Sequence, residues 1–168
     1  MIILIILVTV IILATSIYYI SFIKALYITK TPYVWSFDSH LKMLKKLNLE
    51  KWKTIIDLWC GDGKVLRFLE KEFWLVWYGY DLNSFAINYW KILNKIKKSK
   101  VKLFKWDFTK QDISNYDYIF MYLMPSSMKE LEKWIFENKR QDAIVIVNTF
   151  PFPNKKPFKT IDKIYLYK

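Results

Sequence analysis

Glycine is scarce in this chain. Only 3 of the 168 residues are glycine, whereas average usage of about 7% would give roughly twelve. Tryptophan, in contrast, occurs 8 times. Glycine is the usual residue for left-handed turns and for close approach of a ligand to the backbone. The chain must therefore build such features with few glycines, or with other residues in their places.

Cysteine and histidine each occur once, as Cys60 and His40. A single cysteine excludes a disulfide within the chain. Structural zinc sites of the Cys and His type need more ligands than one of each, so we predict no metal site. We interpret Cys60 as a packing residue or a neighbour of a cofactor rather than a nucleophile, and His40 as a polar residue of a helix that precedes the core.

Charged residues are absent from residues 1–23. This apolar run is longer than the roughly 20 residues that cross a bilayer, and Tyr18 and Tyr19 lie near its end, where aromatic side chains favour the membrane interface. A cleaved signal peptide is the alternative, but the run lacks a basic leading segment and exceeds an ordinary signal core in length. We expect residues 1–23 to be a retained transmembrane signal anchor.

The net charge of +12 falls entirely after this run. Lysines that follow the span closely predict a cytoplasmic location for the rest of the chain, a linker over 24–37 and one domain over 38–168. Basic residues also attract anionic lipid headgroups, which we favour over nucleic-acid binding as the reason for the charge. Six lysines between Lys91 and Lys102 lack interleaved aromatic residues, so we interpret them as a solvated helix end.

Apolar runs and helical patterns alternate after residue 37. The fold class predicted is α/β: a Rossmann-like, mostly parallel sheet with helices on both faces, preceded by one N-terminal transmembrane helix. Strands are expected at 54–58, 76–80, 101–104, 118–123, 143–148 and 164–167, and helices at 38–47, 64–71, 84–97 and 127–138.

The segment from Asp57 to Gly63 (DLWCGDG) connects the first expected strand to a helix. Such a turn presents backbone N–H groups to a ligand, and its glycines let the ligand come close. Gly61 and Gly63 are present, but Trp59 stands where a nucleotide-binding turn usually has glycine. Its indole would obstruct the ligand, and a left-handed conformation there would add about 1–2 kcal/mol of strain.

Three aspartates follow successive strands: Asp57, Asp81 and Asp107. In a parallel sheet these strand ends line one crevice. A carboxylate after the second strand suits the two hydroxyls of a ribose. The pair Asp107 and Phe108 suits adenine, because the carboxylate accepts from the exocyclic amine and the ring packs on the base. A dinucleotide-binding domain shares this logic, but the chain has no second half for a substrate.

Several tryptophans besides Trp59 occupy positions where glycine would be typical: Trp52, Trp74, Trp77 and Trp106. We hypothesise that UGA codons meaning glycine in the encoding organism were translated as tryptophan, as the code of some uncultured bacterial lineages would require. The alternative is a tryptophan-rich core, which suits Trp90 and Trp134 better because they lie in helical patterns.

The order of these motifs resembles that of the class I, seven-strand S-adenosylmethionine (SAM)-dependent methyltransferases. More narrowly, the chain is similar to the membrane-anchored protein-lysine methyltransferases that include the ATP synthase c-subunit and adenine nucleotide translocase enzymes and their prokaryotic relatives. The segments that carry the resemblance are the apolar N-terminus, Pro32 to Val34, Met43-Leu44, Asp57 to Gly63, Gly79 to Asn83, Asp107-Phe108, Tyr116 to Tyr118, Met124 to Ser126 and Phe150 to Pro153.

The resemblance implies SAM as the cofactor. The residues that would contact it are Asp57, Trp59, Gly61, Gly63, Asp81, Leu82, Asp107 and Phe108. Those that would line the acceptor site are Tyr122, Met124, Pro125 and Ser126. Two departures from the family are Trp59 in place of glycine and Asp81 where relatives often have glutamate.

The function expected is methylation of a protein lysine at the membrane. Methyl transfer from a sulfonium mainly needs alignment and a neutral amine, so no general base is assigned. Two alternatives remain open. One is a methyltransferase that acts on a small-molecule or lipid amine. The other is a non-catalytic, membrane-tethered module whose SAM cleft is degenerate because of Trp59.

Overall fold

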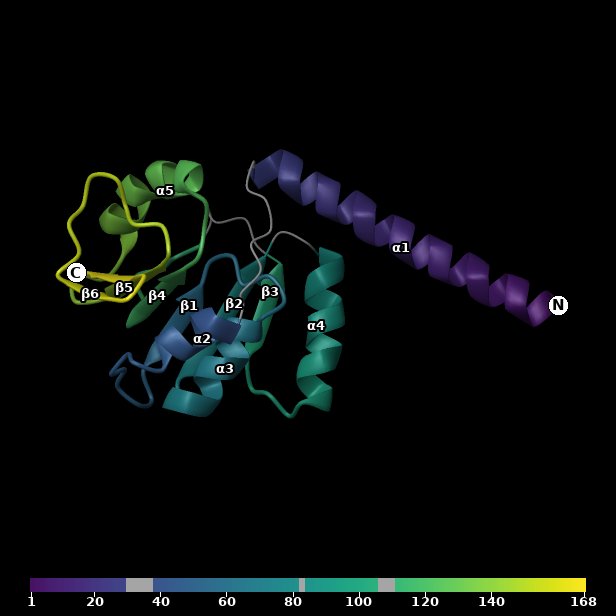
Figure 1. Cartoon of the computed structure of the whole chain (residues 1–168), viewed down its shortest axis with the longest axis horizontal. Helices are drawn as coiled ribbons and strands as arrows, with labels where there is room; N and C mark the ends of the chain where they lie inside the picture. Colours follow the sequence, from purple (N-terminus) through teal and green to yellow (C-terminus); the bar gives the residue numbers. More distant parts are fainter. Residues whose placement is uncertain (30–37, 82–83, 106–110) are drawn as a thin grey trace.

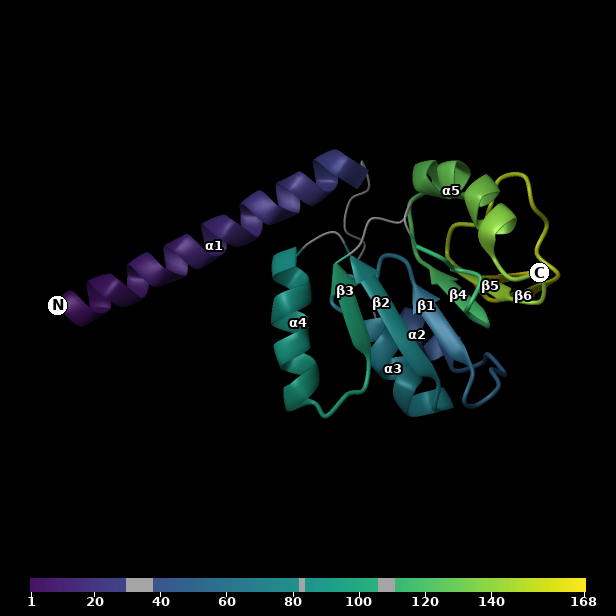
Figure 2. The same cartoon turned by 180° about the vertical axis from the view of Figure 1, so that it is seen from behind.

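The protein consists of a long N-terminal helix and an α/β domain (Figures 1 and 2). The structure is a computed structural model of the whole chain and describes residues 1–29, 38–81, 84–105 and 111–168. Helix α1 spans Ile2–Thr29, and its segment Ile2–Lys24 is long and apolar enough to cross a membrane. At 1.5 Å per residue, 23 residues extend about 34 Å, against a hydrocarbon core of about 30 Å.

The domain is built on a seven-stranded sheet with the order β3-β2-β1-β4-β5-β7-β6. The first five strands in the chain are parallel where they pair, and β7 runs antiparallel to β5 and β6. The strand bounds are β1 Thr54–Asp57, β2 Val76–Asp81, β3 Lys102–Lys105, β4 Tyr118–Met121, β5 Ile144–Asn148, β6 Lys159–Ile161 and β7 Ile164–Tyr167. The predicted mostly parallel, Rossmann-like sheet is therefore confirmed.

Helices cover both faces of the sheet. The helix bounds are α2 Asp38–Leu44, α3 Lys64–Phe73, α4 Ser84–Ile96 and α5 Pro125–Asn138. One apolar cluster joins α2, α3 and α4 to the sheet and contains Ile55. The other joins α5 to the opposite face and contains Ile56. Neighbouring residues of β1 thus point to opposite faces, and both are fully buried, as a central parallel strand requires.

Local sequence explains where the helices begin and end. Helix α3 starts after Gly63, whose φ is 66°, and stops at Trp74, whose φ is 55°. Helix α5 begins at Pro125, because proline fixes the φ of a first helical turn and lacks the N–H that this turn would leave unpaired. The expected helices and strands are present, with ends shifted by a few residues. Strand β6, just after Pro157, was not predicted, because prolines at 151, 153 and 157 indicated only irregular chain.

Candidate functional site

The carboxyl ends of β1, β2 and β4 meet at one edge of the sheet. Asp57, the last residue of β1, lies level with Gly79 of β2 and Phe120 of β4. The turn after β1 is tied to β2, because the Cys60 N–H donates to the Tyr80 carbonyl at 2.9 Å. The predicted gathering of the turn and the strand ends is what the structure shows.

Asp57 is the most perturbed carboxyl of this edge. Its side chain is 3% exposed, and its Oδ1 accepts the Trp59 N–H at 3.1 Å. Burial raises the pKa of Asp57 to about 8, and the nearby carboxylates of Asp81 and Asp62 add to the rise. A cationic ligand at this edge would favour the ionised form of Asp57, because an opposite charge lowers a carboxyl pKa.

Asp81 reaches back to the turn. Its Oδ2 accepts the Gly61 N–H at 3.0 Å, so the carboxylate after β2 fixes the backbone of the β1 turn. Gly61 and Gly63 both have positive φ, at 50° and 66°. The helix α3 that follows begins with Asp62 accepting the Lys64 N–H at 2.9 Å. The turn thus has the strand-turn-helix geometry that suits a nucleotide, as its sequence predicts.

Gly79 in β2 lets the turn pack tightly. A Cβ built at this position would lie 2.6 Å from Leu66 Cδ1, 2.7 Å from Leu103 Cδ2 and 2.8 Å from Cys60 Sγ. No side chain fits in that space. The absence of a side chain at Gly79 therefore allows the β1 turn and helix α3 to sit against β2, a requirement that strand patterning alone did not indicate.

Trp59 does not adopt a left-handed conformation. The strain that a left-handed backbone would add therefore does not arise at this residue. Its half-buried ring packs against the apolar cluster that contains Tyr80 and Ile113, beside the strand ends where a nucleotide would lie. The obstruction predicted for its indole thus remains the open point of the turn.

Two other tryptophans do have the backbone of glycine. Trp52 has φ 67° and Trp74 has φ 55°, and both side chains are exposed, at 72% and 59%. A positive φ is an outlier for a bulky residue. Trp77, in contrast, is only 2% exposed and belongs to the core, although its buried Nε1 has no hydrogen-bond partner among the described residues. Trp106 lies outside the described residues.

Three predicted cofactor contacts, Leu82, Asp107 and Phe108, also lie outside the described residues. The structure therefore brings together Asp57, Trp59, Gly61, Gly63 and Asp81 and leaves the adenine side of the predicted site as a prediction. In the part of the chain that is described, no group of His, Cys, Asp or Glu is placed to hold a metal ion.

Aromatic rings gather where β4 and β5 end. The Tyr122 ring, just after β4, meets the His40 ring edge-on at 5.3 Å and stacks with Phe150 at 6.5 Å between centroids. Burial raises the pKa of the Tyr122 hydroxyl, despite a hydrogen bond with Thr149. Burial, with the charge of Lys163, lowers the pKa of His40, which favours a neutral imidazole. Sequence analysis placed His40 in the helix but missed its contact with Tyr122.

Asn148 and Thr149 complete this group. Asn148 is 1% exposed, and its Nδ2 has no hydrogen-bond partner among the described residues. Thr149 has φ 70°, which is costly for a β-branched residue and persists only where the surroundings impose it. A buried amide donor beside a strained backbone at a strand end is typical of a functional site. Neither residue belongs to a motif, so sequence analysis did not find them.

The remaining predicted acceptor residues lead into α5. Met124 is the residue before the helix, Pro125 is its first residue, and Ser126 is exposed. Their backbone directs the chain away from the end of β4. Of the four predicted acceptor residues, Tyr122 has the contacts described above, whereas Met124, Pro125 and Ser126 position the helix that follows.

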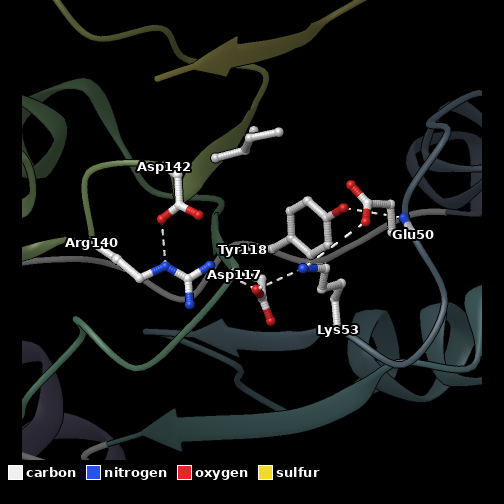
Figure 3. Close-up of a pocket in the computed structure, with 7 residues that line it drawn as sticks. Glu50, Lys53, Asp117, Tyr118, Arg140 and Asp142 are labelled. Carbon is white, nitrogen blue, oxygen red and sulfur yellow. Dashed lines mark hydrogen bonds and ion pairs between the residues drawn. The ribbon is translucent and has the colours of Figure 1, made fainter.

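A polar pocket lies at the opposite edge of the sheet (Figure 3). Asp117, before β4, accepts from Arg140 at 2.7 Å and from the Thr54 N–H at 2.8 Å, and lies 3.4 Å from the Lys53 ammonium. Although burial opposes it, these hydrogen bonds hold the pKa of Asp117 well below its usual value. The charges pair with one another at the start of β1 and β4, so we interpret this pocket as structural.

Comparison with known sequences identifies a family and its members. The model of the ANTKMT methyltransferase domain matches residues 57–159. The ATP synthase c-subunit lysine N-methyltransferase of Xenopus laevis is 28% identical over 129 residues, which cover 75% of this chain and 56% of that protein. The Homo sapiens protein of the same name is 27% identical over 143 residues, covering 81% and 60%. The chain thus spans less than two thirds of the length of these curated relatives.

Solved structures show the same fold. An RNA methyltransferase from Salinibacter ruber, in complex with S-adenosyl-L-homocysteine, superposes with a TM-score of 0.72 at 19% identity, over 80% of this chain and 92% of that one. A SAM-dependent methyltransferase from Thiobacillus denitrificans, with the same ligand, gives a TM-score of 0.57 at 19% identity, over 73% and 52%. The domain therefore has the class I methyltransferase fold.

Proposed function

The chain belongs to the ANTKMT methyltransferase domain family, and from this premise we propose that it transfers a methyl group from SAM to a lysine side chain of a membrane-associated protein. The observation that carries the proposal is the meeting of two features at one sheet edge. The turn Asp57–Gly63 ends β1, and the aromatic group of Tyr122, His40 and Phe150 ends β4 and β5. One edge can therefore hold both a cofactor and an acceptor.

The residues of the turn fit SAM in chemical type. Asp57 is a buried carboxyl whose ionisation a cationic ligand would stabilise. Gly61 and Gly63 expose backbone without a Cβ, and Asp81 carries a carboxylate that suits ribose hydroxyls. When bound, SAM supplies an electrophilic methyl group. The predicted contacts of Leu82, Asp107 and Phe108 would complete the site on its adenine side.

The acceptor side fits a lysine. A methylene chain packs against aromatic rings, and a cationic amine is attracted to their faces. Tyr122 and Phe150 provide such rings, and Asn148 provides a buried polar group beside them. The lysine must lose its proton before it reacts, and a largely apolar surrounding favours the neutral amine. The names of the curated relatives also indicate a lysine of a membrane protein, the c-subunit of ATP synthase.

The apolar helix α1 supports an action at the membrane. Every described side chain from residue 1 to residue 20 is exposed, so the domain does not cover this apolar surface. We propose that α1 spans the bilayer once and that the lysines after it keep the domain in the cytoplasm. The enzyme would then meet substrates that are themselves embedded in the membrane.

Trp59 sets the condition for this function. We propose that glycine is the working residue at position 59 and that the indole, packed near Tyr80 at the strand ends, competes with SAM for space. If tryptophan is the natural residue, the chain becomes the inert, membrane-tethered module described above.

The test is methyl transfer by the full chain in nanodiscs, with and without Trp59→Gly. Tritiated SAM and the c-subunit of the same organism's ATP synthase are supplied, and the modified residue is located by mass spectrometry. We expect label on a lysine. Tyr122→Phe should lower kcat, because Tyr122 lies at the acceptor end of β4, whereas Tyr118→Phe at the other end of the strand is the matched control.

Other outcomes separate the alternatives. Label in the lipid fraction or in a small molecule would replace the protein substrate with an amine of that class. SAM binding without transfer to any fraction would leave the turn intact and refute the proposed acceptor. A folded Trp59→Gly protein that neither binds SAM nor transfers a methyl group would leave the tethered module.

A further inference from the structure

We infer that the outer face of α4 rests on the surface of a bilayer that contains anionic lipid. This outer face is defined by four exposed residues: Lys91, Ile92, Lys95 and Ile96. The inference rests on the anchorage by α1 proposed above and assigns the side of the domain that faces the lipid. It replaces the interpretation of these lysines as a solvated helix end.

The apolar part of this face is not explained by packing. Ile92 and Ile96 are 61% and 72% exposed, although both are large aliphatic residues. They are four positions apart and so form neighbours on one side of the helix. The opposite side of α4 is buried through Ile87 and Asn94, at 1% and 5% exposed. The helix therefore has a packed inner side and an unpartnered apolar stripe on its outer side.

The charge around this stripe has one sign. The segment 84–105 contains no Asp or Glu. It contains seven exposed lysines: Lys91, Lys95, Lys97, Lys98, Lys100, Lys102 and Lys105. No carboxylate forms an ion pair with them among the described residues. Lysines beside an apolar stripe are the pattern of a helix that lies in the interface of an anionic membrane.

The position of α4 fits this role. Helix α1 contacts α4. Both views show α1 extending away from the domain on the side where α4 and the edge strand β3 lie (Figures 1 and 2). If α1 crosses the bilayer, the element of the domain nearest to the lipid surface is α4. The anchor and the basic, apolar face then contact the same membrane.

Nucleic acid fits the same face less well. Recognition of single strands uses exposed aromatic rings on which bases stack. The exposed residues of the stripe are isoleucines, and the nearby Phe104 ring stacks on Tyr80 at 5.3 Å between centroids. A lipid surface uses both features of the face, because acyl chains accept the isoleucines and headgroups pair with the lysines.

The test uses an environment-sensitive fluorophore on the full chain. The native thiol of Cys60 is buried, so an introduced cysteine is labelled selectively. The Ile96→Cys variant, labelled with nitrobenzoxadiazole, is reconstituted into nanodiscs of phosphatidylcholine alone or mixed with phosphatidylglycerol. In the anionic discs we expect a several-fold rise in emission, a blue shift and quenching by a spin-labelled lipid. A label at Lys129→Cys on α5 should show none of these changes.

Charge variants make the test specific. Lys91→Gln/Lys95→Gln/Lys98→Gln should abolish the rise in emission, whereas Lys129→Gln/Lys133→Gln/Lys156→Gln, with the same loss of charge elsewhere, should preserve it. Protein that co-purifies with the discs while the label at position 96 stays in water would overturn the inference alone. Protein that does not co-purify with either kind of disc would overturn the anchorage as well. Brightening by an RNA homopolymer and not by anionic lipid would assign the face to nucleic acid.

Discussion

Trp74 offers a sharp test of whether glycine belongs where tryptophan stands. It follows the last residue of α3, with φ 55° and ψ 35°, and its N–H donates to the Glu70 carbonyl. This is the left-handed position at which helices favour glycine. A non-glycine residue there bears about 1–2 kcal/mol of strain, while glycine costs about 0.5–1 kcal/mol in chain entropy.

The comparison to make is Trp74→Gly against Trp74→Ala. Both variants remove the exposed ring and its 6.1 Å contact with the Trp52 ring, so their difference isolates the backbone. We expect the glycine variant to be more stable than the alanine variant by about 0.5–1 kcal/mol, because strain relief exceeds the entropy cost. The assay is urea unfolding of the full chain in detergent, followed by circular dichroism.

The matched control is Trp134 in the interior of α5. There the order should reverse, and alanine should be more stable than glycine by about 1 kcal/mol. A Trp74→Gly protein less stable than Trp74→Ala would refute the left-handed geometry and, with it, the structural argument for glycine. The codons give an independent answer: several UGG codons among the eight tryptophans would refute the hypothesis of reassigned UGA.

The contacts of the domain support three further predictions. Gly79→Ala should destabilise the fold by about 1–3 kcal/mol, measured by urea unfolding, because its Cβ would overlap Leu66 and Leu103; an unchanged midpoint would contradict this packing. Because the folded-state pKa of Asp57 is raised to about 8, stability should fall as pH rises from about 4 to 8; Asp57→Asn should flatten this slope, and an equally steep slope would assign it elsewhere. Asp117→Asn should cost about 1.5–3 kcal/mol at neutral pH by removing charged hydrogen bonds to Thr54 and Arg140, whereas the exposed Glu130→Gln should change nothing.

The order of the elements could be predicted because the signals are local. Buried parallel strands appear as apolar runs, such as Tyr118–Met121, and the Asp57–Gly63 turn sits between such a run and a helical pattern. Strand β6 could not be predicted in this way. It is a short edge strand of partly exposed residues, and its pairing with β7 is set by tertiary contacts rather than by its own pattern.

The candidate site divides in the same way. The Asp57, Gly61 and Asp81 cluster was predictable, because each residue lies at a strand end or in a turn of recognisable spacing. His40 and Asn148 were not, because the fold brings them to Tyr122 and Phe150 from segments distant in the sequence. The positive φ of Trp52 and Trp74 was suggested by their place in turns, but only backbone geometry separates them from the buried Trp77.

The most direct test of the central claim is the SAM affinity of the full chain in nanodiscs, measured by calorimetry on the chain as written and on Trp59→Gly. We predict that the glycine form binds SAM at least tenfold more tightly, which corresponds to about 1.4 kcal/mol. Equal binding by both forms would place the Trp59 ring outside the cleft. Failure of both folded proteins to bind SAM would contradict the account.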